Sequence, residues 1–176
     1  MYLSAILKII SFVTVIIILL AVSACGGDDA FNAGGCNAKD TPTDIHDFAV
    51  VGVSTDSASG LEVIDDSGDF TLSWELTSSC TYTYSVSLSY DDILQPIDNE
   101  FFSGTCDLRS SCDSMKGFSC RFDATAKTIS CDGGPAIDVS SVLIGPSPQT
   151  PYIIFTASNE MGDQPTPFAE QVQFEY

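Results

Sequence analysis

The chain has 176 residues, of which 24 are Asp or Glu and six are Lys or Arg, giving a formal net charge of −18 at neutral pH. Such a charge repels nucleic acid and anionic lipid head groups, so neither is expected as a partner. A chain of this length is expected to form one globular domain.

The first 25 residues have the pattern of an export signal. Lys8 is the only charged residue before the apolar stretch 9–21, and small residues follow in Val22-Ser23-Ala24-Cys25. A short charged region, an apolar region and small residues before a cleavage point are what such a signal needs. The last four residues resemble the lipobox of bacterial lipoproteins, in which the cysteine becomes the lipid-bearing first residue. An uncleaved membrane-spanning helix or a plain secretory signal is the alternative.

This resemblance implies a helical signal peptide over residues 1–24 and lipidation of Cys25. Acyl chains such as palmitate would then anchor the protein, because more than one chain holds a protein firmly on a membrane. The expected location is the cell envelope, on the outer membrane or facing the periplasm. Residues 25–47 are predicted to form a flexible tether, because they contain Gly, Asn and Asp and few apolar side chains.

From Phe48 onward, apolar and polar residues alternate, which is typical of strands in a sheet with one solvated face. Gly, Pro and Asp clusters separate short strands of this kind, and no later stretch has a convincing helical period. The pattern predicts one two-sheet sandwich over residues 48–176. The predicted strands are 48–54, 61–64, 70–77, 81–90, 101–103, 120–123, 128–131, 137–144, 152–158 and 171–176.

The chain has seven cysteines, and assigning Cys25 to lipid leaves six, which suggests three disulfides in an oxidising compartment. Cys120 and Cys131 flank a predicted hairpin with its turn at 124–127, where they would face each other. The other candidate pairs are Cys106 with Cys112 and Cys36 with Cys80. The cysteine-rich segment 104–134 is expected to be an insertion. No two cysteines have C-x-x-C spacing, so a zinc or iron–sulfur site is not expected.

Several motifs resemble fibronectin type III and related immunoglobulin-like domains. Leu72-Ser73-Trp74 followed by Tyr84-Ser85-Val86 resembles strands B and C, and Pro148-x-Thr150-x-Tyr152 resembles the corner before strand F. Ala157-x-Asn159-x-x-Gly162 resembles the end of strand F with its following turn, and residues 171–176 would be strand G.

The resemblance implies an all-β, antiparallel immunoglobulin-like sandwich. In that family Trp74 and Tyr84 would fill the core, and the Tyr152 hydroxyl would tie the corner to the backbone. Two features depart from the family pattern. The segment 91–147 is longer than usual, and Tyr152 to Ala157 is one residue shorter than the family spacing.

The candidate metal site is Asp65-Asp66-Ser67-Gly68-Asp69. Calcium binds six to eight oxygen ligands, so Asp65, Asp66 and Asp69 are candidate calcium ligands. The spacing is not that of an EF-hand loop. A solvated acidic surface is the alternative interpretation, with no cofactor at all.

Two groups of side chains are considered for binding or catalysis. Tyr82, Tyr84 and Tyr90 fall on one face of a predicted strand, as a carbohydrate- or peptide-binding platform would, or as core packing would. His46, flanked by Asp44 and Asp47, is interpreted as an exposed tether residue, because no second histidine or nucleophile elbow accompanies it.

Together these observations predict an envelope-anchored lipoprotein that acts as a non-enzymatic binding, adhesion or structural module. Its working surface would be the loop 91–99 or the loop 159–168, because loops on a rigid scaffold usually carry recognition. The expected partners are the membrane, through the lipid, and another envelope or surface protein or a glycan. The alternatives are an envelope hydrolase with an unrecognised acidic site and a calcium-dependent adhesion domain.

Overall fold

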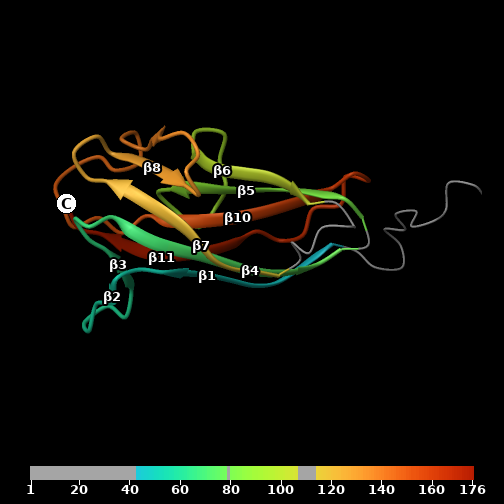
Figure 1. Cartoon of the computed structure of the whole chain (residues 1–176), viewed down its shortest axis with the longest axis horizontal. Coiled ribbons are helices and arrows are strands. Elements are labelled where there is room, and N and C mark those ends of the chain that lie inside the picture. Colours follow the sequence, from blue (N-terminus) through green and yellow to red (C-terminus); the bar gives the residue numbers. More distant parts are fainter. Residues whose placement is uncertain (1–42, 79, 107–113) are drawn as a thin grey trace, which may run out of the picture. The chain divides into compact units, whose positions relative to one another are not determined.

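The computed structural model describes residues 43–78, 80–106 and 114–176. These residues contain strands and no helix, and they form two β-sheets that pack on a shared core (Figure 1). The predicted all-β, two-sheet architecture is therefore confirmed. The predicted signal peptide with its helix, the lipidation site Cys25, the larger part of the tether, and Cys36 and Cys112 all lie outside the described residues. No helix in the described ranges is long and apolar enough to cross a membrane.

The first sheet has five strands, and every neighbouring pair in it is antiparallel. In spatial order its strands are β1 (Asp44–Val51), β4 (Asp69–Thr77), β7 (Ser114–Asp123), β8 (Thr128–Cys131) and β9 (Ile137–Asp138).

The second sheet has six strands and contains one parallel pair, β3 with β11, where an entirely antiparallel sandwich was predicted. The chain leaves the first sheet after β1, and the short β2–β3 hairpin brings β3 beside β11 in the same direction. In spatial order the strands are β2 (Ser54–Thr55), β3 (Glu62–Ile64), β11 (Phe168–Phe174), β10 (Tyr152–Asn159), β5 (Tyr82–Ser89) and β6 (Asn99–Cys106).

The cross-strand disulfide predicted from the hairpin is confirmed. Cys120 of β7 lies opposite Cys131 of β8, and the two are bonded. Cys80 and Cys106 are also disulfide-bonded, and the partners predicted for them lie outside the described residues.

The segment 104–134, predicted to be an insertion, supplies two strands of the first sheet. β7 pairs along β4 and lies near the middle of that sheet. Phe122 and Ile129 of this segment are fully buried in the core. Burial of these side chains explains why the segment is part of the sandwich.

The folded domain begins earlier than the predicted tether boundary at residue 47. Strand β1 starts at Asp44 and contains His46. Thr43, Ile45 and Phe48 are all buried, so this stretch packs on the core although it is rich in polar residues.

The predicted strand 137–144 is strand only at Ile137 and Asp138. Asp138 Oδ1 accepts a hydrogen bond from the Ser140 N–H at 2.8 Å, and the Leu143 N–H donates to the Val139 carbonyl at 3.1 Å. These local hydrogen bonds turn the chain and end the strand.

A group of aromatic rings joins the two sheets at the centre of the core. Phe155 of β10 stacks on Phe48 of β1 and on Trp74 of β4, with ring centroids 5.3 and 5.1 Å apart. Tyr84 of β5 lies 5.1 Å from the Trp74 ring and 6.2 Å from the Phe155 ring. Trp74 and Tyr84 therefore pack in the core, as the family resemblance implied.

We predict that Phe155→Ala lowers the free energy of unfolding by about 3–5 kcal/mol, because it leaves a cavity among three aromatic rings. Denaturant unfolding followed by circular dichroism measures the loss. Phe168→Ala is the matched control, because this ring is 38% exposed, and its expected loss is below about 1.5 kcal/mol. Equal losses in the two variants would contradict the central role of Phe155.

Candidate functional site

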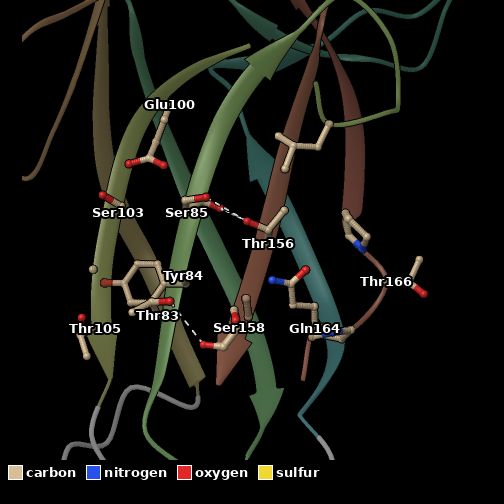
Figure 2. A pocket seen from close by; sticks show the side chains of 15 residues that line it. Thr83, Tyr84, Ser85, Glu100, Ser103, Thr105, Thr156, Ser158, Gln164 and Thr166 are labelled. Carbon is tan, nitrogen blue, oxygen red and sulfur yellow. Dashed lines mark hydrogen bonds between the residues drawn. The ribbon is translucent and has the colours of Figure 1, made fainter. Parts of the chain in front are cut away.

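A groove of about 710 Å³ lies on the outer face of the six-stranded sheet, over β6, β5 and β10 (Figure 2). Its volume is in the range of pockets that bind small molecules or short polymers. Alternation along the strands explains its polar floor, because Tyr82, Tyr84 and Val86 of β5 point toward the core, and Thr83 and Ser85 point outward.

Six hydroxyl side chains form two rows across the floor of the groove, which we call the hydroxyl rows (Figure 2). Strand geometry separates the side chains by roughly 4.8 Å between strands and roughly 6.8 Å along a strand. The first row is Ser103, Ser85 and Thr156, and the second row is Thr105, Thr83 and Ser158.

Hydrogen bonds hold part of this floor in place and leave part of it unpaired. Ser85 Oγ and Thr156 Oγ1 are 2.9 Å apart, and Thr83 Oγ1 donates to the Ser158 carbonyl at 3.3 Å. Within the described part of the chain, the hydroxyls of Ser103 and Thr105 have no hydrogen-bond partner. These two hydroxyls are free to donate to a ligand and to accept from it.

The two loops predicted as working surfaces lie at opposite ends of the sheet. Strand β10 begins opposite the last residue of β5 and ends opposite its first, so the loops 90–98 and 160–167 are separated by the length of these strands. Both loops border the groove. Leu94 contributes from the first loop, and residues 164–167 contribute from the second. Gln164 and Thr166 of the second loop are seen in Figure 2.

A buried asparagine organises the second loop. Asn159 Oδ1 accepts hydrogen bonds from the backbone N–H groups of Met161 and Asp163 at 3.0 and 2.9 Å. Its Nδ2 donates to Thr43 Oγ1 at 3.0 Å, and the Thr43 N–H donates to Asp163 Oδ2 at 2.8 Å. The part of the loop that leads into this wall of the groove is therefore fixed to the start of the folded domain.

The predicted tyrosine platform is not formed. Tyr82 is only 2% exposed, and Tyr84 is half-buried against Trp74, so burial raises the pKa of its hydroxyl. Tyr90 is exposed and donates its hydroxyl to the Ser141 carbonyl. Tyr82 and Tyr84 lie on β5 under the opposite sheet, and Tyr90 follows the end of that strand.

Two of the three carboxylates of the candidate calcium turn, those of Asp65 and Asp69, have partners in the protein. Ser67 donates to Asp65 Oδ1 from its hydroxyl at 2.6 Å and its N–H at 2.9 Å, and these bonds hold the pKa of Asp65 below its usual value. Asp69 lies 3.7 Å from Arg121. The described residues contain no group of three His, Cys, Asp or Glu side chains placed to hold a metal ion.

His46 is exposed, as predicted, but it lies in a strand. Its Nε2 is 2.7 Å from Thr77 Oγ1 on β4, and its Nδ1 is 3.7 Å from an Asp44 oxygen. These contacts join β1 to β4 at the edge of the first sheet, away from the residues that line the groove.

Two further carboxylates bind backbone where β1 leaves the first sheet. Glu170 accepts from the Val50 N–H at 2.7 Å, and Glu62 accepts from the Gly52 N–H at 2.9 Å. Burial raises the pKa of Glu170, and the negative charges of Glu62 and Asp47 raise it further. These side chains satisfy the unpaired N–H groups of an edge strand, which is a structural role.

Comparison of the chain with protein-family models, with curated proteins and with solved structures found no match. The functional argument therefore depends on the site itself. The alternation predicted for the strand 81–90 implied a polar outward face, but sequence reasoning did not identify the neighbouring hydroxyl side chains. Alternation in β10, where Thr156 and Ser158 flank a buried Ala157, was the available signal.

We predict that Glu170→Gln stabilises the protein at pH 7 by less than about 1 kcal/mol, because water screens this half-buried group. The raised pKa means that ionisation of Glu170 opposes folding. The stabilisation that protonated Glu170 gives the folded state is complete below the ordinary glutamate pKa of 4.5. It is lost as the pH rises through the pKa that Glu170 has in the folded protein. The glutamine oxygen still accepts from the Val50 N–H.

Denaturant unfolding between pH 4 and pH 7 tests the prediction for Glu170→Gln. Glu75→Gln, at an exposed position of β4, is the control. The free energy of unfolding of Glu170→Gln should exceed that of the parent by an amount that grows with rising pH. An advantage that grows with falling pH would show the opposite sign and contradict the prediction.

Proposed function

We propose that this protein is a lipoprotein of the bacterial cell envelope, with residues 1–24 removed and Cys25 acylated. The lipobox-like Val22-Ser23-Ala24-Cys25 supports this, and so do the disulfides. Cys80, Cys106, Cys120 and Cys131 are disulfide-bonded, as expected for a protein folded in an oxidising compartment. The domain would hang from a tether on the outer membrane or facing the periplasm.

We also propose that the domain is a variant of the immunoglobulin-like sandwich. The adjacent strands β5, β10 and β11 have the order of strands C, F and G, and β1 with β4 has the order of A and B. The first sheet departs from the family order A-B-E-D. In that order the strand beside B comes later in the chain than the next strand of the sheet. Here β7, the strand beside β4, comes earlier in the chain than β8. Among the described residues, the Tyr152 hydroxyl has no hydrogen-bond partner.

The function that the site supports best is non-enzymatic binding of an uncharged, hydroxyl-rich ligand such as a glycan, and the hydroxyl rows carry this proposal. Hydroxyl groups both donate and accept, as the hydroxyls of a glycan do. The described lining has one carboxylate, Glu100, and no cationic side chain to attract an anion. Glycoside hydrolysis uses a pair of carboxylates, so this lining favours binding over the hydrolase alternative.

A second candidate function is adhesion to another envelope protein through the end of the domain that carries the loop 90–98. Ile93, Ile97 and Ile144 are 64%, 67% and 66% exposed there. The Tyr90 hydroxyl joins their two loops by donating to a carbonyl in the second loop. Grouped exposed apolar side chains are typical of protein-binding surfaces.

We predict that Cys25→Ser prevents acylation and moves the protein from the membrane fraction to the soluble fraction, because the thiol is the site of lipid attachment. Mass spectrometry of the intact protein and detergent partitioning measure both effects. Ser23→Ala is the control, because it keeps a small residue before the cysteine. Native protein with its leader attached and a bare Cys25 thiol would overturn the proposed anchoring.

We predict that the double variant Thr83→Val with Thr105→Val weakens glycan binding about tenfold, because each lost hydrogen bond is worth about 0.5–1.5 kcal/mol. Full-length protein in detergent is titrated calorimetrically with neutral oligosaccharides of glucose, galactose and N-acetylglucosamine. Thr71→Val, on the outer face of β4, is the control. Absence of binding to every sugar, or equal binding by the double variant, would refute the groove as a glycan site.

A further inference from the structure

A second cavity, of about 570 Å³, opens at the lateral edge of the sandwich, where β6 of one sheet approaches β8 and β9 of the other. Its lining combines aromatic rings with acidic side chains, and we call it the aromatic cleft. The lining residues that matter here are Tyr84, Phe102, Phe118, Glu100 and Asp132.

The three rings lie against one another and are only half-buried. The centroids of Phe102 and Phe118 are 4.4 Å apart, and those of Tyr84 and Phe102 are 5.8 Å apart. Gly104 lies opposite Tyr84 on the neighbouring strand, and a Cβ atom there would clash with the Tyr84 hydroxyl. The glycine therefore gives the tyrosine ring room to extend toward this edge of the sheet.

The two carboxylates of the cleft have no partner within the described part of the chain. Two cationic side chains of the first sheet and its hairpin turn, Arg121 and Lys127, have other contacts. Arg121 lies 3.7 Å from Asp69, and Lys127 Nζ donates to the Leu143 carbonyl at 2.7 Å. The described lining of the cleft is therefore negative and contains no cationic side chain.

We propose that the aromatic cleft binds an organic cation, either a quaternary ammonium group or the charged head of an arginine or lysine side chain. The negative faces of aromatic rings attract such cations, and a nearby carboxylate strengthens the attraction. The formal charge of −18 raises the local concentration of cations around the whole chain. The cleft shares Tyr84, Glu100 and Ser103 with the groove that holds the hydroxyl rows, but the proposal does not depend on glycan binding.

The test uses full-length protein in a non-ionic detergent and the fluorescence of Trp74, the single tryptophan of the chain. The Trp74 ring lies 6.0 Å from Phe118 and 5.1 Å from Tyr84, so it reports on the cleft. The probes are choline, its uncharged isostere 3,3-dimethyl-1-butanol, and arginine amide. At least one cation should bind about tenfold more tightly than the uncharged isostere, and salt should weaken that binding.

The relative affinities of choline and arginine amide then identify the source of the cation. A stronger response to choline indicates a quaternary ammonium ligand, and a stronger response to arginine amide indicates a basic side chain of a partner protein. Binding of the uncharged isostere as tightly as both cations would show a merely apolar slot and overturn the proposal. Absence of binding by both cations at millimolar concentration would also overturn it.

Asp132→Asn is the informative variant, because asparagine keeps the size of the side chain and tolerates the backbone φ of 50° at this position. It should weaken cation binding at least about threefold. Asp92→Asn, at an exposed loop position outside the cleft, removes the same charge and should have little effect. Equal weakening by both variants would assign the effect to the total charge and overturn the cleft as the site.

Discussion

The stacking of Phe155 on Phe48 and Trp74 is the contact on which the arrangement of the two sheets depends. It joins a central strand of the second sheet to two strands of the first. Face-to-face sheets are separated by side chains that interdigitate in this way. Because Phe155 points inward, Thr156 beside it must point outward, into the groove. The packing that holds the sandwich together therefore also orients the floor of the candidate site.

Local patterns predicted much of this architecture, because alternation and hairpin register need information from only a few neighbouring residues. Cys120 and Cys131 belong to one hairpin, so their pairing follows from the turn between them. The hydroxyl rows were beyond such reasoning. Ser85 lies beside Ser103 on one side and Thr156 on the other, and only the register of three strands brings these distant residues together.

The acidic composition was the hardest feature to interpret from the sequence. Several carboxylates accept hydrogen bonds from backbone N–H groups: Asp56 from Ser59, Asp65 from Ser67, and Glu170 from Val50. Short acidic side chains commonly stabilise turns in this way. In the linear sequence Asp65 resembled a metal ligand, and the partner of Glu170, 120 positions away, is visible only in the folded chain.

The contacts of Thr43 with Asn159 and Asp163 have a mechanical consequence. A pull on the chain ahead of Thr43 would be transmitted both to β1 and to the loop beside the groove. Strand β1 is aligned lengthwise against β4, so its ladder of hydrogen bonds would be loaded in shear, with many bonds resisting at once. Hydrogen bonds loaded together in this way resist a pulling force better than hydrogen bonds loaded one at a time.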